Sequence, residues 1–353
     1  LGEDVGYIAR IIAKDTHLDA TEREEIDPPT KYDSKIPYYS TRQWSGDVIN
    51  GVPFMTMGKP YAWGSDFEEG AKSKFTDLPL WPSHIKCKTV RTYRNYMIAL
   101  NLESDSCLVD GSGDPIWNGA YDLANPWCPD LLDSSATPPA GWPYPNRQAY
   151  AAKMSDWADN LHQNALWWSH SVIGKQPELA SWADSDPTKD SGWNFLGGAG
   201  GPIRDGRVLK DSFVIYRERS VWSMREIGGI NVFAFKQLFD DVGCLGLDCV
   251  AEIDGWHFVV GQSDVYMHNG VQKRSVADGV VRKELFNSID PNAVEKVFVA
   301  VRYEDKEAWV CIPEASTNFE KTCNVAWVYN WEENSWSKRS LPNTTCSVYT
   351  VLS

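Results

Sequence analysis

The sequence predicts an all-β fold: a β-propeller built of short antiparallel blades, with a short N-terminal helical arm and a loop-rich insertion. Three observations support this prediction. The 353 residues include 17 Trp, 15 Tyr and 12 Phe, the large flat side chains that fill the wedges between propeller blades. Strand-turn-strand segments recur roughly every 35–50 residues, which is the spacing of blades. A chain of this length also fits either two ordinary domains or one large all-β domain.

Five segments carry the recurring pattern: residues 87–103, 207–224, 249–270, 294–314 and 324–342. In the last four, an apolar β-prone strand runs into a short polar turn and then into a second strand. These turns are Arg217-Glu218-Arg219, Gln262-Ser263-Asp264, Glu304-Asp305-Lys306 and Glu332-Glu333-Asn334. The first segment shows its strand clearly and its return only weakly. A single hairpin cannot bury its apolar face alone, so the segments are expected to stack.

The order of these patterns divides the chain into four parts. Residues 1–43 form a helical arm or connector, whose helix ends at Pro28-Pro29 because Pro disfavours helix at its own position and at the one before it. Residues 44–104 and 161–353 carry the propeller strands. Between them, residues 105–160 are dense in Gly, Pro, Asp and Trp. This segment is too long for a structureless connection, so it is expected to be a loop-rich insertion, with one helix in 148–163.

The charge balance is acidic, with 34 Lys and Arg against 48 Asp and Glu, a net charge of −14 and a pI near 4.9. This argues against a protein that grips nucleic-acid phosphates over a broad surface. No apolar run approaches the roughly 18–20 residues that a membrane helix needs. The sequence from Leu1 onward also shows no secretion-signal pattern.

The eight cysteines form no CxxC pair, and no His lies at a zinc-like spacing from them. In a chain of this length without an export signal, we expect free and mostly buried thiols rather than disulfides. Cys244 and Cys249 are the closest pair in the sequence and the first to test.

No set of residues indicates an enzyme. The six His pair with no Ser or Cys in a nucleophile motif such as GxSxG, and HExxH is absent. His257 alternates with apolar residues in a strand, so we expect a structural role for it and not a catalytic one. The run from Gly197 to Pro202 lacks the frame of a phosphate loop and is expected to be a tight crossing between blades. The sequence therefore predicts no catalytic residue, cofactor or metal site.

Acidic clusters and one turn motif are weaker signals. Two groups lie close enough in sequence to chelate Ca²⁺, but neither has the frame of an EF-hand; they are Asp184, Asp186 and Asp190, and Asp110, Ser112 and Asp114. Residues 188–195 partly resemble the Asp-box turn of sialidases and other propellers. That turn is a structural hairpin device, so it again favours a propeller.

The order of short motifs along residues 44–342 resembles one family. The motifs include Trp168-Ser169, Pro177, Trp182, Asp186-Pro187-Thr188, Gly201-Pro202-Ile203, Leu209-Lys210-Asp211, Ser220-Val221-Trp222, Gly255-Trp256-His257-Phe258 and Asp264-Val265-Tyr266. Upstream, Leu80-Trp81-Pro82 and Val90-Arg91-Thr92-Tyr93 also fit, as does Ala326-Trp327-Val328-Tyr329 downstream. In this order they are similar to the tail nozzle, or tail tubular protein B, group of short-tailed bacteriophages, a group related to head-to-tail stabilisation proteins.

The resemblance implies a structural virion protein. It implies a homo-oligomeric, hexameric ring around the DNA channel of a phage tail, which seals the channel and conducts DNA on ejection. The implied partners are tail adaptor and tail fibre proteins, with viral DNA passing without specific binding. An acidic wall repels phosphate, so the net charge suits such a conduit. The implied location is the virion, assembled in the host bacterial cytoplasm.

Two departures from the family and one alternative function remain open. The chain begins abruptly at Leu1, so we expect either a longer polypeptide or a neighbouring chain that completes the propeller. The insertion 105–160 is longer than expected and could contact fibres or a receptor. The alternative is a carbohydrate-binding or sialidase-like propeller, acting as a tail-tip adhesin or a glycan hydrolase. The candidate partner or glycan contacts are Trp117, Trp127, Trp142 and Trp157, whose rings can stack on sugars.

Overall fold

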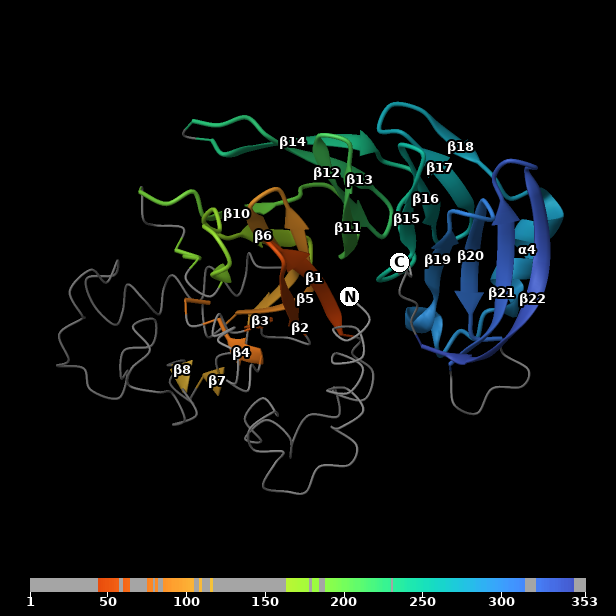
Figure 1. The fold of residues 1–353 in the computed structure, drawn as a ribbon, viewed down its shortest axis with the longest axis horizontal. Coiled ribbons are helices and arrows are strands. Elements are labelled where there is room, and N and C mark those ends of the chain that lie inside the picture. The colour runs from red at the N-terminus through yellow and green to blue at the C-terminus, as the bar shows by residue number, and fades with distance from the viewer. Residues whose placement is uncertain are drawn as a thin grey trace, which may run out of the picture. The chain divides into compact units, whose positions relative to one another are not determined.

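A computed structural model gives the structure of the chain (Figure 1). It describes residues 44–56, 60–63, 75–78, 80–81, 85–104, 108–109, 115–116, 163–177, 180–183, 188–229, 231–314 and 322–345. Contacts divide the chain into two units, one of residues 1–44 and 350–353 and one of residues 45–349. All strands and helices given below lie in the second unit. The predicted arm 1–43 and the predicted helix in 148–163 fall outside the described residues, apart from Gln163.

Five four-stranded antiparallel sheets, here called blades 1 to 5, account for nearly all of the described strands. Blade 1 is β1 (Ser45–Ile49), β2 (Val52–Thr56), β3 (Pro60–Trp63) and β4 (Phe75–Asp77). Blade 2 is β5 (Ile85–Tyr93), β6 (Tyr96–Ser104), β9 (Ala165–Trp168) and β10 (Gly192–Phe195). Blade 3 is β11 (Ile203–Leu209), β12 (Ser212–Arg217), β13 (Val221–Glu226) and β14 (Phe233–Phe239). Blade 4 is β15 (Val250–Ile253), β16 (Trp256–Val260), β17 (Val265–His268) and β18 (Lys273–Ser275). Blade 5 is β19 (Phe298–Arg302), β20 (Glu307–Ile312), β21 (Cys323–Asn330) and β22 (Ser335–Thr344). The fold is therefore all-β and propeller-like, as predicted.

Each blade is a simple meander in which strands follow one another across the sheet. The first strands of the blades begin at residues 45, 85, 203, 250 and 298, so the predicted repeat length holds except where the segment after β6 intervenes. Contacts join β1 to β5, β5 to β11, β11 to β15 and β15 to β19. These five first strands are therefore neighbours, and we call them the inner strands.

Two-residue turns join the first and second strands where the sequence supplies residues that adopt positive φ. Asn50 and Gly51 have φ of 51° and 83°, and Asp254 and Gly255 have 49° and 77°. Positive φ at both central residues is the type I′ geometry, whose twist matches that of the flanking strands. Asn-Gly and Asp-Gly are the dipeptides that this turn type prefers.

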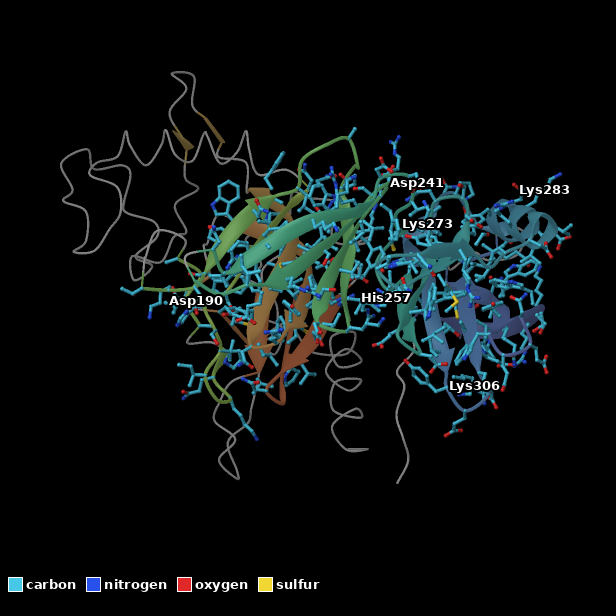
Figure 2. All side chains as sticks on the ribbon, turned by 90° about the horizontal axis from the view of Figure 1, so that it is seen from above. Asp190, Asp241, His257, Lys273, Lys283 and Lys306 are labelled. Atoms are coloured by element: carbon cyan, nitrogen blue, oxygen red, sulfur yellow. The ribbon has the colours of Figure 1, made fainter. Side chains whose placement is uncertain are left out.

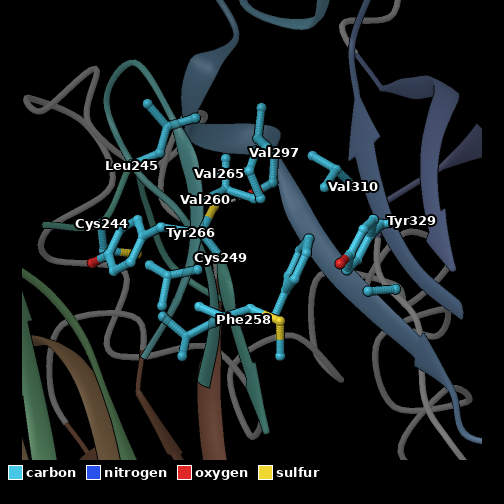
Figure 3. Close-up of a cluster of buried hydrophobic side chains, with 14 of the residues drawn as sticks. Cys244, Leu245, Cys249, Phe258, Val260, Val265, Tyr266, Val297, Val310 and Tyr329 are labelled. Carbon is cyan, nitrogen blue, oxygen red and sulfur yellow. Dashed lines mark hydrogen bonds between the residues drawn. The ribbon is translucent and has the colours of Figure 1, made fainter. Parts of the chain in front are cut away.

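Apolar side chains fill the spaces between successive blades. Trp167 of blade 2 and Phe54 of blade 1 belong to one buried apolar cluster, and Leu100 of blade 2 and Phe213 of blade 3 belong to another. A third cluster joins blades 3, 4 and 5 (Figure 3), where the rings of Phe258 and Tyr329 stack at 5.8 Å. Because each blade buries both faces only with neighbours, stacking supplies the core that a lone hairpin lacks.

Most predicted turns are confirmed. Residues 218–220 lie between β12 and β13, residues 261–264 between β16 and β17, residues 303–306 between β19 and β20, and residues 331–334 between β21 and β22. The return strand of the first segment, predicted only weakly, is the nine-residue β6. One helix was not predicted: α4 (Gly279–Ser288), which joins blade 4 to blade 5 through a 3-10 turn (Val294–Lys296).

Within the predicted insertion, β7 (Leu108–Val109) pairs with β8 (Pro115–Ile116). No helix in the described part of the chain is long and apolar enough to cross a membrane.

Candidate functional site at the inner strands

A buried charge cluster centred on Arg91 joins the inner strands. Arg91 lies on β5, and its side chain is only 4% exposed. Its Nε donates to Asp205 Oδ1 at 2.8 Å and its Nη2 to Asp205 Oδ2 at 3.1 Å, which is a bidentate pair with a fully buried carboxylate on β11. Its Nη1 donates to Ser45 Oγ and to the Gly46 carbonyl of β1, both at 3.1 Å. One side chain thus connects blades 1, 2 and 3.

Asp248 extends the cluster to blades 4 and 5. It precedes β15 with a φ of 56°. Its backbone N–H donates to Asp205 Oδ2 at 2.9 Å, and its carbonyl accepts from Val299 of β19 at 2.8 Å. Its Oδ1 accepts from Arg91 at 2.8 Å and from Arg207 at 3.0 Å. Through Asp248, all five inner strands share one hydrogen-bonded network.

The neighbouring carboxylates keep Arg91 charged. Burial alone would lower the pKa of Arg91, but the charges of Asp205 and Asp248 outweigh it, so the pKa is raised further above its ordinary value. A buried ion pair is favourable only when its remaining donors and acceptors are also satisfied. Asp205 meets this condition because its two oxygens also accept the N–H groups of Gly206 and Asp248. The arrangement holds the inner strands together.

A second buried polar cluster links blades 3 and 4. Tyr216 Oη of β12 lies 2.6 Å from His257 Nδ1 of β16 and 2.5 Å from His268 Nε2 of β17. All three side chains are buried, and His257 lies in the interior between the blades (Figure 2). His257 Nε2 lies 2.9 Å from the Val208 carbonyl, and the Gly270 N–H donates to His268 Nδ1 at 3.1 Å.

These partners fix the proton positions for neutral imidazoles. His257 Nε2 must carry a proton to donate to Val208, so its Nδ1 accepts the Tyr216 hydroxyl proton. His268 Nδ1 accepts from Gly270, so its Nε2–H donates to Tyr216 Oη. Burial lowers the pKa of His257 to about 4, and burial together with His257 lowers that of His268 to about 3. Both histidines are therefore neutral near pH 7, and both ring nitrogens of His257 are hydrogen-bonded within the fold.

The glycine-rich run joins β10 of blade 2 to β11 of blade 3, the predicted crossing between blades. Its carbonyls wrap the guanidinium of Arg217: Nη1 donates to Gly197 at 2.6 Å, Nε to Gly201 at 2.7 Å and Nη2 to Gly198 at 3.1 Å. A Cβ on Gly200 would lie 2.1 Å from Ser220 Oγ. Burial lowers the pKa of Arg217. Glycine is therefore needed at position 200 for close approach, and carbonyl groups of the run face a cation.

Residues 188–191 of the Asp-box-like segment lie between β9 and β10, the third and fourth strands of blade 2, and the rest of the segment is β10. The Asp190 carbonyl accepts from Trp168 Nε1 at 2.6 Å, and its N–H donates to His170 Nδ1 at 3.0 Å. A Cβ on Gly192 would lie 2.7 Å from the Trp168 ring. The segment thus closes a hairpin through backbone contacts.

Several predicted residues lie outside the described part of the chain. They are Trp117, Trp127, Trp142, Trp157, Asp184, Asp186, Asp110, Ser112 and Asp114. Among the described residues, no group of three or more His, Cys, Asp or Glu side chains could hold a metal ion. The five described cysteines are free and buried: Cys87, Cys244, Cys249, Cys311 and Cys323.

The Arg91 cluster was not predicted from the sequence. Arg91 and Asp205 are separated by 114 positions, so no local spacing connects them. The available signal was a charged residue inside each of two β-prone strands, in Val90-Arg91-Thr92-Tyr93 and Ile203-Arg204-Asp205-Gly206. A charge inside a strand that is otherwise buried needs a partner, but the sequence does not say which one.

Comparisons with known proteins identify no family. No family model matches the chain, and no curated protein matches it. Among solved structures, it is similar to Hsv2 of Kluyvelomyces marxianus, with 8% identity and a TM-score of 0.33, over 81% of this chain and 60% of that one. It is also similar to an apocarotenoid oxygenase of Synechocystis, with 6% identity and a TM-score of 0.32, over 89% of this chain and 63% of that one. The chain thus spans less than two thirds of either protein, and likeness at this level assigns no activity.

Proposed function

We propose that this chain is a structural subunit of a bacteriophage tail, a nozzle or tail-tube protein that assembles into a hexameric ring around the DNA channel. The ordered motifs that resemble that family support this assignment. Many of them lie in described strands, such as Val90-Arg91-Thr92-Tyr93 in β5, Val221-Trp222 in β13 and Trp256-His257-Phe258 in β16. Their side chains contribute to the apolar core, to the charge cluster around Arg91 and to the buried polar cluster of Tyr216, His257 and His268. These are structural roles, as expected for a scaffold protein.

One observation carries the proposal furthest: the polar groups of the inner strands are used to join blades. Arg91 spans blades 1, 2 and 3 by direct hydrogen bonds, and Asp248 reaches blade 5 through Val299. A nucleic-acid duplex cannot pass between strands that are bridged in this way. In a tail, the DNA conduit would therefore lie between several copies of the chain, which is what a ring provides.

The test is to locate the protein in a virion. Gold-labelled antibody against the chain, applied to purified phage particles whose genome encodes it, is expected to mark the tail, and quantitative mass spectrometry is expected to give copies in a multiple of six. Absence from purified virions, despite expression during infection, would overturn the proposal. Particles lacking the protein should retain DNA poorly or fail to eject it.

The carbohydrate-active alternative is separated by a second assay on the same preparation. A tail-channel subunit needs no hydrolase activity, so the purified chain is expected to release no reducing sugar or sialic acid from a glycan panel. Specific glycan cleavage would instead favour a hydrolase. Glycan binding without cleavage, abolished by Trp117→Ala and Trp142→Ala together, would favour a tail-tip adhesin.

A further inference from the structure

The junction between blades 3 and 4 contains two buried histidines. His257 and His268 are both 0% exposed, and both are hydrogen-bonded to the Tyr216 hydroxyl of blade 3. The remaining histidine of the described residues, His170, follows β9 of blade 2 and is only half-buried. In the described part of the chain, a proton taken up by a buried imidazole therefore acts at this junction.

The hydrogen bonds of this cluster leave no place for a further proton. In the neutral arrangement, Tyr216 donates to His257 Nδ1 and accepts from His268 Nε2. A proton on His257 Nδ1 would face the Tyr216 hydroxyl, whose own proton would then lose its acceptor. A proton on His268 Nδ1 would face the Gly270 N–H, which donates to that nitrogen at 3.1 Å. Either protonation places a donor against a donor inside an apolar interface, where an unmade hydrogen bond is costly.

Charged residues flank the two imidazoles within blade 4. Glu252 of β15 lies opposite His257, and Lys273 of β18 lies opposite His268. Glu252 is exposed, and Lys273 forms an ion pair with Asp241, which follows β14 (Figure 2). The charge of Lys273 thus already has a partner, and that of Glu252 is in contact with water.

Blade 3 presents charges of both signs to His257. Burial is the main cause of the lowered pKa of His257; the charge of Arg207 on β11 lowers it further, and that of Asp205 raises it. The other titratable groups around the cluster are Tyr216, Tyr266 and Cys244. Burial raises the pKa of both tyrosines, so both phenols stay protonated below pH 7. The imidazoles are therefore the groups of this cluster that take up protons in weak acid.

We propose that weak acid opens the junction between blades 3 and 4, parting the two sheets while each sheet keeps its own strand pairing. A protonated His257 or His268 gains water and escapes the opposing donor only when the interface opens. Residues 257 and 268 are paired through the backbone within blade 4, and this pairing does not involve the imidazoles. Protonation can therefore part the blades and leave the sheet intact.

The two histidines bind protons more weakly in the closed junction than in an open one. The pKa values of His257 and His268 in the closed junction are about 4 and about 3, against about 6.5 for a solvated histidine. The open junction therefore binds more protons, and its population rises as pH falls from about 6.5 toward 4. Such opening does not depend on a role in a phage tail.

Site-resolved thiol labelling of the full chain tests the proposal. Cys244 and Cys249 belong to the apolar cluster that includes Tyr216, whereas Cys87 lies in the cluster of blades 1 and 2 and Cys311 in that of blade 5. Dithiodipyridine reacts with thiols in weak acid, and each rate is divided by that of the urea-unfolded chain at the same pH. From pH 7.5 to pH 5, the corrected rate at Cys244 and Cys249 is expected to rise at least about 100-fold, and that at Cys87 and Cys311 less than about threefold.

Two outcomes for the wild-type chain would overturn the proposal. Equal rises at all four cysteines would mean that acid unfolds the whole protein. Unchanged rates at Cys244 and Cys249 would mean that the junction stays closed.

The double variant His257→Asn and His268→Gln removes both titrations and keeps polar contacts to Tyr216. The Asn Oδ1 can accept in place of Nδ1, and the Gln Nε2 can donate in place of the imidazole Nε2. The rise at Cys244 should then fall below about threefold, and a full rise in this variant would contradict the proposal. His170→Asn is the matched control, because His170 lies outside the junction, and it should leave the rise at Cys244 unchanged. Loss of the rise in that control would equally count against the proposal.

Discussion

Tyr216 and His257 share a buried hydrogen bond of 2.6 Å that joins blade 3 to blade 4. His268 adds a second bond to the same hydroxyl, at 2.5 Å. Three polar side chains thus lie in an apolar interface, each satisfied by the others and by backbone groups. This relationship makes the stability of the fold sensitive to pH.

Acidification should destabilise the protein below about pH 6.5. The unfolded histidines bind protons near pH 6.5, whereas the pKa values of folded His257 and His268 are about 4 and about 3. The unfolded state therefore binds more protons in this window, and stability falls as pH falls. By pH 5, each histidine should reduce the free energy of unfolding by about 2 kcal/mol. Urea unfolding at pH 7, 6 and 5 measures this loss.

The double variant His257→Asn and His268→Asn is the control for that titration. It should be less stable at pH 7, because Tyr216 loses both partners, yet its stability should change little between pH 7 and pH 5. A wild-type stability that stays constant over this range would contradict the assignment of neutral buried histidines.

The ion pair between Arg91 and Asp205 should show strong coupling in a double-mutant cycle. Arg91→Met leaves a buried carboxylate without its counter-ion, and Asp205→Asn leaves the guanidinium poorly paired, so each should cost about 3–5 kcal/mol. The double variant should cost clearly less than the sum. The exposed pair Arg302–Asp305, at 2.5 Å, is the comparison and should couple by less than about 1 kcal/mol. Additive effects at Arg91 and Asp205 would show that the cluster does not join the blades.

Gly243→Ala should destabilise the junction between blades 3 and 4. A Cβ at Gly243 would lie 2.3 Å from the Arg217 carbonyl oxygen and 2.4 Å from the Glu218 backbone. Because backbone cannot move aside cheaply, the expected cost is at least about 2 kcal/mol. Gly197→Ala is the matched control, since no atom lies within 4 Å of its added Cβ, and it should change stability by less than about 0.5 kcal/mol. Equal melting temperatures for the two variants would refute the close approach of Gly243 to the backbone of Arg217 and Glu218.

The buried thiols should be unreactive in the folded protein. Burial, followed by Cys323, raises the pKa of Cys311 to about 12, and burial raises that of Cys323 to about 12 as well. The pKa of Cys249 is also raised, through its hydrogen bond with Cys244 and its burial. At pH 8, a thiol reagent such as dithionitrobenzoate should label these cysteines only after denaturation. Rapid labelling of Cys249 or Cys311 in the native protein, mapped by mass spectrometry, would contradict this prediction. It would show that the packing around these thiols opens in the folded protein.

The sequence predicted strands and turns correctly where the conformational preferences of neighbouring residues determine them. Polar turns between β-prone strands located hairpins such as the one around Gln262-Ser263-Asp264. The Arg94-Asn95 turn has neither Gly nor Pro, so the β5–β6 return was only weakly visible. Helix α4 buries only Leu285 and therefore has little amphipathic pattern. Its one clear signal is Asp278, whose side chain accepts from the N–H groups of Val280 and Val281.

The charge cluster around Arg91 could not be predicted from the sequence, for a different reason. Arg91 and Asp205 lie on separate blades, and their contact depends on how the sheets pack. The Tyr216–His257 bond has the same origin, across 41 positions. A single sequence shows that a buried strand contains a charge or a histidine, while the partner is set by tertiary structure.

Electron microscopy of the purified full-length chain, with mass measurement of the same sample, tests the central claim most directly. The proposed function predicts closed rings with a central channel and a mass of six subunits, with particles of the same outline at the tail of the virion. A stable monomer with no place in a virion would contradict it.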